Sequence, residues 1–320
     1  MIARWTSLVA VGLAVVAGLL GGCGGEEPKK AAAGPEPKAG AAPVTPAVPA
    51  DDKASWPKTL NVSAIPDIKN RDLFLTTYTA FTDRLTKELG VEVKFVPVTD
   101  YAATVDGLAG GRLDLVWYGA YTSIQAIHAS KGNCERLVCR EEDRKFKSVF
   151  VAAPDSGIRT LTDLKGKTFS FGSESSTSGH IMPRRFLFEA GIVPEKDFAK
   201  FSFSGAHDAT AKAVESGAVQ AGALNYLVWD SMTKDRKVDA AKVAVFHTTP
   251  EYTDYCWCAR KDLPAGLREK LKSFFLGLDP AKPDDKKLLD LQKATKFVAA
   301  QDEWWKACED WATASGFLKD

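Results

Sequence analysis

The chain has 320 residues, 45% of them hydrophobic, and its 42 Lys and Arg residues nearly balance its 41 Asp and Glu residues. This length is sufficient to bury one large core or two smaller ones. The near-neutral charge excludes nucleic-acid binding through bulk positive charge and also a disordered acidic chain, and six cysteines are too few for a disulfide scaffold of this size.

Residues 1–22 have the pattern of a signal peptide. Arg4 supplies a positive charge, and the apolar run from Leu8 to Leu20 would span about 20 Å as a helix, too short for a bilayer core of about 30 Å. The following Leu20-Gly21-Gly22-Cys23 resembles a bacterial lipobox. We therefore predict lipidation of Cys23 and anchoring to a membrane on the periplasmic side of the cell envelope; an ordinary signal peptide with an incidental cysteine is the alternative.

Residues 23–57 have the composition of a tether. Ala, Gly and Lys are interspersed there with seven prolines, at positions 28, 35, 37, 43, 46, 49 and 57. Such a sequence cannot bury a core and is typical of an extended spacer. We expect it to hold a folded body away from the membrane.

From residue 58 onward, strand and helix patterns alternate. In the first part, strands are predicted at 60–66, 91–98, 113–117 and 147–153, and helices at 71–89, 101–110 and 120–130. In the second part, strands are predicted at 168–172, 201–205, 221–225, 243–246 and 255–260, and helices at 161–164, 178–190, 206–216, 226–233, 264–278, 284–300 and 302–315. The alternation predicts an α/β fold with mostly parallel sheets in two units.

Four polar segments lie where predicted strands and helices meet: 114–119, 175–180, 204–210 and 252–255. Ligands of open α/β sheets bind beyond the carboxyl ends of strands, and helix N-termini favour anions. The run Ser175-Ser176-Thr177-Ser178-Gly179-His180 offers hydroxyl and backbone donors suited to a small tetrahedral oxyanion; an N-cap with surplus hydroxyls is the alternative. Tyr118 would add a phenol donor, whereas a lone His207 is more often a structural residue.

These segments, in this order and spacing, resemble the phosphate, phosphite and phosphonate substrate-binding proteins of ABC importers. The resemblance covers about residues 58–318 and rests on 113–119, 175–180 and 204–210. It is strongest to the branch named for selenate, through segments 62–67, 95–103, 140–143 and 278–280. The resemblance implies a binding protein that performs no catalysis and needs no cofactor, metal or nucleic acid, and that acts as a monomer.

The family fold implied is the type II periplasmic binding protein fold. Two α/β lobes are then joined by a two-crossing hinge, with the ligand in the cleft between them. The crossings are expected near Ala152–Asp155 and Phe246–Thr249, which gives lobe 1 as 58–151 plus 250–320 and lobe 2 as 152–249. Ligand contacts from both lobes would stabilise a closed state that an ABC permease in the inner membrane recognises.

The resemblance also implies the ligand-binding residues. Hydroxyl and backbone donors would come from Ser176, Thr177 and Ser178, and a further donor from His207. Tyr101 and Tyr118 would close the site from the first lobe. Asp254 or Tyr255 would line its mouth. An acceptor such as Asp254 would select a protonated oxyanion over a fully ionised one.

One position departs from the family pattern. Relatives that bind aminoalkylphosphonates carry a carboxylate in the segment that matches Asn225-Tyr226-Leu227; here Leu227 falls near that place, and Asn225 is the polar residue. This departure disfavours an aminophosphonate and favours a small inorganic oxyanion. Selenate, sulfate, phosphate and phosphite remain open.

The five cysteines beyond Cys23 have two possible arrangements. Cys134 and Cys139 flank a predicted loop and would pair there, and Cys256 or Cys258 would pair with Cys308. Alternatively, Cys256, Cys258 and Cys308 would form a thiol site for a soft metal or trivalent arsenic.

Two other functions remain open. The protein would have the same fold as a sensor of oxyanions or arsenite that docks onto a membrane histidine kinase, and Trp304, Trp305 and Trp311 would offer a partner surface or, more typically, core packing. A hydrolase is less favoured, because the Gly-x-Ser-x-Gly nucleophile motif is missing from the sequence.

Overall fold

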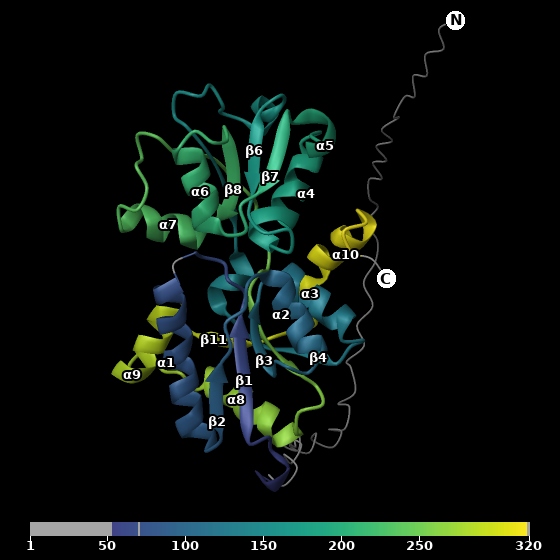
Figure 1. Cartoon of the computed structure of the whole chain (residues 1–320), viewed down its shortest axis with the longest axis vertical. Coiled ribbons are helices and arrows are strands. Elements are labelled where there is room, and N and C mark those ends of the chain that lie inside the picture. The colour runs from purple at the N-terminus through teal and green to yellow at the C-terminus, as the bar shows by residue number, and fades with distance from the viewer. Residues whose placement is uncertain (1–52, 70, 319–320) are drawn as a thin grey trace, which may run out of the picture. The chain divides into compact units, whose positions relative to one another are not determined.

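The computed structural model describes residues 53–69 and 71–318. The predicted signal peptide, Cys23 and nearly all of the predicted tether lie outside these residues. Within them, no helix has both the length and the apolar character that crossing a bilayer requires. The described residues form two lobes, each built around a β-sheet with helices on its faces (Figure 1).

The first sheet has the strand order β11-β4-β10-β3-β1-β2. Its strands are Thr59–Ala64 (β1), Glu92–Phe95 (β2), Leu115–Tyr118 (β3), Cys134–Arg140 (β4), Cys256–Arg260 (β10) and Phe297–Ala299 (β11). Strands β1, β2 and β3 are parallel, whereas β10 is antiparallel to β3 and β4. The expectation of a mostly parallel sheet is wrong here, because the chain returns from the second lobe and enters this sheet in the opposite direction.

Helices cover both faces of the first sheet. They are Arg71–Leu89 (α1), Tyr101–Ala109 (α2), Ala120–Ala129 (α3), Ala265–Leu276 (α8), Pro283–Leu291 (α9) and Lys306–Ala314 (α10), with short 3₁₀ turns at Lys53–Ser55, Glu141–Lys145 and Asp302–Trp305. Strand β3 is buried along its whole length, as expected of a central strand covered on both faces. The carboxyl end of β3 and the start of α3 face the second lobe.

The second sheet has the strand order β7-β6-β8-β5-β9. Its strands are Ser148–Ala152 (β5), Thr168–Phe171 (β6), Lys200–Phe203 (β7), Ala221–Asn225 (β8) and Ala244–Thr248 (β9). Helices Met182–Glu189 (α4), Pro194–Asp197 (α5), His207–Glu215 (α6) and Tyr226–Lys234 (α7) pack on it, with short turns at Leu161–Leu164 and Thr177–Ile181. β6, β7 and β8 are parallel, and β5 is antiparallel to both its neighbours.

The chain crosses between the lobes at two adjacent places. Phe146 and Tyr252 exchange backbone hydrogen bonds, and the Ser148 N–H donates to Oγ1 of Thr249 at 2.9 Å. Because β5 already belongs to the second sheet, the first boundary falls before Ser148 and not at 152. The return crossing follows Thr248, at the end of the expected segment.

Two stretches differ from the predicted elements. The segment 134–140, predicted to hold a loop between Cys134 and Cys139, is strand β4. The predicted helix 284–300 ends at Leu291 and is followed by β11. Lys293 ends the helix because its backbone is left-handed, with φ of 54°. The break turns the chain back to the edge of the first sheet.

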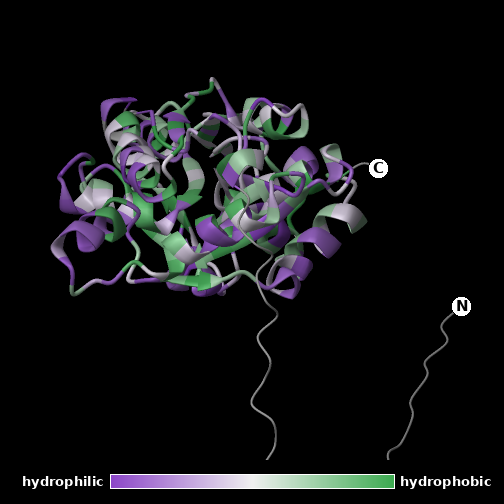
Figure 2. Cartoon of the chain, turned by 90° about the horizontal axis from the view of Figure 1, so that it is seen from below, coloured by the Kyte–Doolittle hydropathy of each residue, from purple (hydrophilic) through white to green (hydrophobic). Residues whose placement is uncertain are grey.

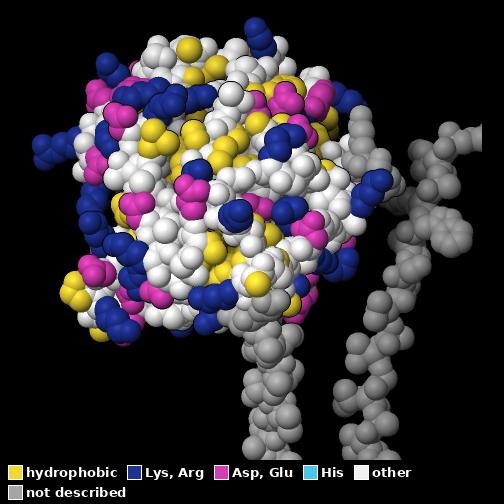
Figure 3. Space-filling model, turned by 60° about the horizontal axis from the view of Figure 1, so that its bottom comes forward, with side chains coloured by type: hydrophobic (Ala, Val, Ile, Leu, Met, Phe, Trp, Pro, Cys, Tyr) yellow, Lys and Arg dark blue, Asp and Glu magenta, His cyan; other side chains and the backbone are white. Residues whose placement is uncertain are grey.

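The hydrophobic core follows the sheets. Figure 2 shows hydrophobic residues concentrated along the strands and hydrophilic residues on the outer helical turns. Trp257 of β10 is fully buried and stacks on Phe275 of α8, with ring centroids 5.1 Å apart. On the face drawn in Figure 3, basic and acidic side chains are interspersed, with hydrophobic side chains between them.

The five described cysteines are buried and free. Neither predicted disulfide is formed: Cys134 and Cys139 lie in the same strand at an odd spacing, so their side chains point to opposite faces. Cys256 and Cys258 have their sulfurs 3.5 Å apart on one strand face. In residues 53–69 and 71–318, no group of three or more His, Cys, Asp or Glu side chains is arranged to hold a metal, so the predicted thiol site with Cys308 is not assembled.

Candidate functional site

Two helix N-termini meet between the lobes. Helix α3 begins at Ala120 in the first lobe, and a π-helical turn at Thr177–Ile181 leads into α4 in the second. The Tyr121 N–H donates to Oγ1 of Thr177 at 2.9 Å, across the lobe boundary. N–H groups at helix starts are anion-binding elements, and here the first two of α3 are taken by Asp254 and Thr177, which brings these two side chains to the place where the two helix starts meet.

Gly119 allows the two lobes to approach each other. A Cβ atom there would lie 2.9 Å from Oγ1 of Thr177 and 3.1 Å from Oδ1 of Asp254. The backbone at Gly119 is extended, with φ of −78° and ψ of 167°, so glycine is needed for space and not for conformation.

Asp254 lies at the centre of this contact and is fully buried. Its Oδ1 accepts a hydrogen bond from the Ala120 N–H at 3.0 Å, while its Oδ2 has no partner within the protein. Burial raises the pKa of this carboxyl to about 7, although the hydroxyls of Thr177 and Ser178 lower it. Trp305 fixes the backbone here by donating its indole N–H to the Asp254 carbonyl at 2.5 Å.

Tyr101 adds another buried polar atom without a hydrogen-bond partner at this place. Its hydroxyl faces Ser176 but has no hydrogen bond in the protein. The Ser176 hydroxyl itself caps the π-helical turn by accepting from the Gly179 N–H at 3.0 Å. Buried polar atoms are almost always hydrogen-bonded, so the unpaired atoms of Tyr101 and Asp254 indicate a place for a polar ligand. We call Tyr101, Ser176, Thr177, Ser178 and Asp254 the polar cluster.

His207, at the start of α6, lies beside the polar cluster. A Cβ on Gly179 would lie 3.1 Å from its Cε1 and 3.0 Å from the Ser176 hydroxyl. Burial lowers the pKa of His207 to about 3, so its ring is neutral. The Asn225 N–H donates to Nδ1 at 3.3 Å, which places the ring proton on Nε2. His207 therefore offers one N–H donor.

Asn225 and Tyr255 form the border between the polar cluster and the wider cleft. The Asn225 side-chain oxygen accepts from the backbone N–H groups of Leu227 and Val228, and its amide nitrogen donates to the Tyr255 hydroxyl at 2.9 Å. Tyr255 stacks on Trp117 with ring centroids 5.5 Å apart. The predicted positions 225 and 255 are thus adjacent in space.

Tyr118 does not belong to this group. Its hydroxyl donates to the Thr104 carbonyl at 2.7 Å inside the first lobe. Successive side chains of a strand point to opposite faces, and here Trp117 lies on the cleft side. The predicted role of Tyr118 is corrected accordingly: the strand end does reach the cleft, but through its neighbour.

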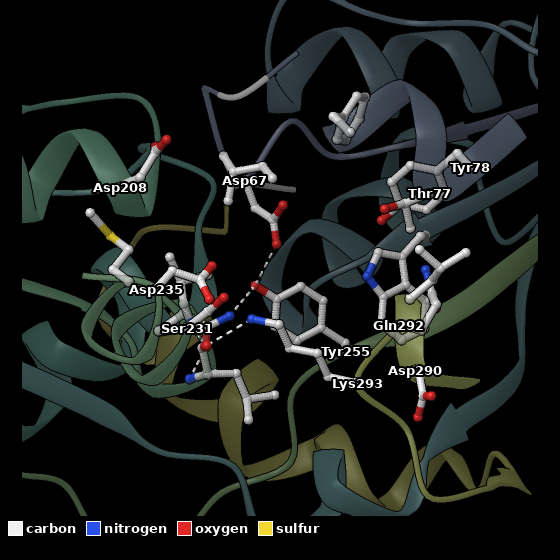
Figure 4. A pocket seen from close by; sticks show the side chains of 18 of the residues that line it. Asp67, Thr77, Tyr78, Asp208, Ser231, Asp235, Tyr255, Asp290, Gln292 and Lys293 are labelled. Carbon is white, nitrogen blue, oxygen red and sulfur yellow. Dashed lines mark hydrogen bonds between the residues drawn. The ribbon is translucent and has the colours of Figure 1, made fainter. Parts of the chain in front are cut away.

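A cavity of about 680 Å³ extends between the lobes from Tyr255 and Asn225. Its walls combine apolar and charged side chains, including Ile68, Trp117, Leu227, Met232, Asp67, Asp208 and Lys293. Figure 4 shows Asp67 and Lys293 on either side of Tyr255. Asp67 and Lys293 are not among the predicted site residues, although Asp67 directly follows the predicted strand 60–66, where ligand-contacting residues of α/β sheets are found.

Arg140 holds the aromatic wall of the cavity. Its guanidinium lies 5.1 Å from the ring centroids of both Trp117 and Tyr255. It donates two hydrogen bonds, of 2.8 and 2.6 Å, to the Asp143 carboxylate. This buried pair satisfies the charge of Arg140 within the wall.

Known proteins with similar sequences and structures identify the family of this chain. Residues 63–305 match the family described as ABC transporter, phosphonate, periplasmic substrate-binding protein. The chain is 40% identical over 267 residues to an ABC transporter phosphite-binding protein of Prochlorococcus marinus, covering 80% of this chain and 89% of that protein. It is 26% identical over 250 residues to the phosphonates-binding periplasmic protein of Escherichia coli, covering 77% and 73%.

A solved structure of the Prochlorococcus marinus protein in complex with methylphosphonate is also similar. The TM-score is 0.78 at 38% identity, and the match covers 82% of this chain and 99% of that one. The expected type II periplasmic binding protein fold is thereby confirmed, and the family acts in transport and not in catalysis. The chain belongs to the family of periplasmic substrate-binding proteins of phosphonate and phosphite ABC importers.

Proposed function

We propose that this protein captures a small phosphorus oxyanion, phosphite or a short phosphonate, in the polar cluster and delivers it to an ABC permease. The observation that carries the proposal is the pair of unpaired buried atoms, Oδ2 of Asp254 and the Tyr101 hydroxyl, beside three hydroxyl residues. The methylphosphonate complex of the Prochlorococcus marinus relative, and the name of that relative as a probable phosphite binding protein, support this ligand class.

The donors of the polar cluster suit a tetrahedral oxyanion. Hydroxyls, backbone N–H groups and the neutral His207 ring would each meet one oxygen without adding a formal charge. Asp254 would accept a hydrogen bond from a protonated oxygen of the ligand. Phosphorus oxyanions keep a proton near neutral pH, whereas sulfate and selenate do not, so we expect the site to favour the former.

The ligand is expected to carry little or no amine. Leu227 lines the cavity. By the resemblance, it falls near the place where aminophosphonate-binding relatives carry a carboxylate. Lys293 also lies in this cavity, and its ammonium donates to the Leu227 carbonyl at 2.8 Å. A ligand ammonium group would meet this positive charge, so we expect 2-aminoethylphosphonate to bind more weakly than methylphosphonate.

Capture would be coupled to lobe closure. Polar-cluster residues come from both lobes, and a ligand held by both stabilises their contact. The permease would then recognise the ligand-bound arrangement. We propose further that Cys23 carries the lipid anchor, which the lipobox sequence supports.

Calorimetric titration of the purified protein, from residue 53 onward, tests the ligand class. We expect binding of phosphite and methylphosphonate and weaker or no binding of sulfate and selenate. Failure to bind any of these anions, or preference for selenate, would contradict the proposal.

The double variant Thr177→Ala, Ser178→Ala tests the site. It removes two donors, and we expect an affinity loss of about a hundredfold, from about 1.5 kcal/mol per hydrogen bond to a charged group. Ser216→Ala, which alters a hydroxyl at the far end of α6, is the control and should bind like the unmodified protein. Retained affinity in the double variant would move the site elsewhere.

A further inference from the structure

A chain of hydrogen bonds leads from the edge of the polar cluster into the interlobe cavity. The Asn225 amide nitrogen donates to the Tyr255 hydroxyl at 2.9 Å, and this hydroxyl donates to Oδ2 of Asp67 at 3.3 Å. Figure 4 shows the Asp67 carboxylate directed at Tyr255. Asp67 follows β1 in the first lobe, whereas Asn225 ends β8 in the second, so the chain connects both lobes.

The direction of each hydrogen bond is set by its neighbours. The Asn225 side-chain oxygen is taken by two backbone N–H groups of α7, so the amide nitrogen must face Tyr255. The His207 Nε2–H lies 3.5 Å from the same hydroxyl. The Tyr255 oxygen therefore accepts the short hydrogen bond from Asn225 and its own proton has Asp67 as acceptor, while the more distant His207 N–H can turn to a ligand.

Charged and titratable groups surround Asp67 on several elements. Burial raises the pKa of Asp67 to about 6, whereas the positive charges nearby lower it. The groups facing it are Lys293 after α9, Arg140 of β4, Asp208 of α6, Tyr255 before β10, Tyr78 of α1 and Tyr101 of α2. The pKa values of the three tyrosines lie well above 10, so their protons stay in place near neutral pH.

We propose that Asp67 is a positioning residue that holds the Tyr255 proton away from the polar cluster and so sets which hydrogen bond Tyr255 offers the ligand. This inference rests on the proposed function. With Asp67 ionised, Tyr255 turns a lone pair to the bound anion, and the carboxylate adds repulsion. With Asp67 protonated, Tyr255 is released to donate to the anion. Anion affinity therefore rises when Asp67 takes up a proton.

The test compares the unmodified protein with Asp67→Asn, which keeps the shape of the side chain without its charge. Dissociation constants for phosphite and methylphosphonate are measured by calorimetry from about pH 5 to about pH 8. Their ratio between the two proteins cancels the titration of the ligand and of Asp254. We expect a ratio near one at the acid end and about tenfold tighter binding by the variant at the alkaline end, with the step near pH 6.

The same comparison in a Tyr255→Phe background separates positioning from charge. There we expect the advantage of Asp67→Asn to shrink by about threefold or more, because only charge repulsion remains. Asp235→Asn, which removes an exposed carboxylate from the same cavity without touching Tyr255, is the matched control and should show no step.

Three outcomes would overturn the proposal: weaker binding by a folded Asp67→Asn at every pH, a flat ratio, or an unchanged advantage in the Tyr255→Phe background. Thermal unfolding of each variant establishes that it is folded. Failure of the unmodified protein to bind any oxyanion would instead overturn the proposed function itself.

Discussion

Asp254 has one hydrogen-bonded oxygen and one unpaired oxygen, and the difference has chemical consequences. The paired oxygen is fixed by the start of α3, and the unpaired one is left for a ligand. Burial raises the pKa of this group above its unfolded value of 3.8, so the folded protein binds the proton more tightly than the unfolded chain. The contribution of Asp254 to the free energy of unfolding of the ligand-free protein should therefore fall as the pH rises from about 4 through 7, and comparing the pH dependence with that of Asp254→Asn isolates it from the opposite contribution of buried His207.

Asp254→Asn tests this assignment. The amide keeps an acceptor for the Ala120 N–H but replaces the proton acceptor with a donor. We expect the ratio of phosphite to selenate affinity to fall by about tenfold or more, since one hydrogen bond to a charged group changes sign. In the unmodified protein we expect phosphite affinity to decline above about pH 7, where Asp254 loses its proton, and in the variant this decline should be shallower. Unchanged discrimination in calorimetric titrations would exclude Asp254 as the selecting group.

The sequence identifies the hydroxyl run and Asp254, but not the side chains that orient them. Tyr118 is the donor expected from the sequence, and only the face of β3 shows that Trp117 lines the cavity instead. Asp67 and Lys293 are separated by more than two hundred positions, and the fold brings them into one cavity. Local pattern therefore predicts residues next to their own helix start, while partners from other elements need the three-dimensional structure.

At the scale of elements, the start of α3 acts as a contact between lobes as well as an anion-binding end. Its first two N–H groups are held by Asp254 and by Thr177 of the other lobe. Gly119, immediately before the helix, keeps this approach open. The affinity of the site thus depends on how closely one helix can approach a facing turn.

Gly119→Ala should crowd the contact between the lobes. Alanine adopts the observed extended backbone without strain, so any fall in the melting temperature comes from the contacts of the new Cβ and not from the backbone. The new Cβ would collide with Thr177 and Asp254, and we expect an affinity loss of about tenfold or more, the range for overpacking a tight contact. Ser130→Ala, at the other end of α3, is the control. Equal affinity in both variants would show that the lobes need not approach this closely.

The same scale shows which elements a sequence pattern can predict. Buried strands such as β3 and β8 are apolar apart from Tyr118 and Asn225 at their ends, and they are found at or close to the expected positions. Strand β4 contains charged Glu135 and Arg136 between two cysteines, so it has no clean strand alternation, and it is recognised only by its pairing with β10 and β11. Strand β11 is short and follows a helix without a proline to mark the end.

At the scale of the whole molecule, the two lobes touch through several independent contacts around the cavity. The backbone N–H of Lys69 donates to both carboxylate oxygens of Asp208, and the backbone N–H of His207 donates to the Asp67 carbonyl at 3.0 Å. On the same side, Lys293 reaches the Leu227 carbonyl. These contacts combine backbone and side-chain groups from both lobes, so closure requires that they form together.

Cys23→Ser tests where the whole molecule resides. Loss of the thiol would prevent lipidation, and we expect the variant to move from the membrane fraction to the soluble periplasmic fraction of the producing cell. Its affinity for phosphite should be unchanged, because the polar cluster lies in residues 101–254. Mass spectrometry of the membrane-extracted protein should detect the lipid on Cys23. An unmodified Cys23 in membrane-associated protein would refute the anchor.

The buried free thiols bear on how the protein matures. Burial raises the pKa of Cys139 and Cys308 far above its usual range, so the reactive thiolate is scarce in the folded state. An exported chain emerges unfolded into an oxidising compartment, where its thiols are exposed to disulfide-forming catalysts until the core closes. During maturation, burial of the thiols then competes with their oxidation. The yield of active protein should therefore depend on the folding rate as much as on the final stability.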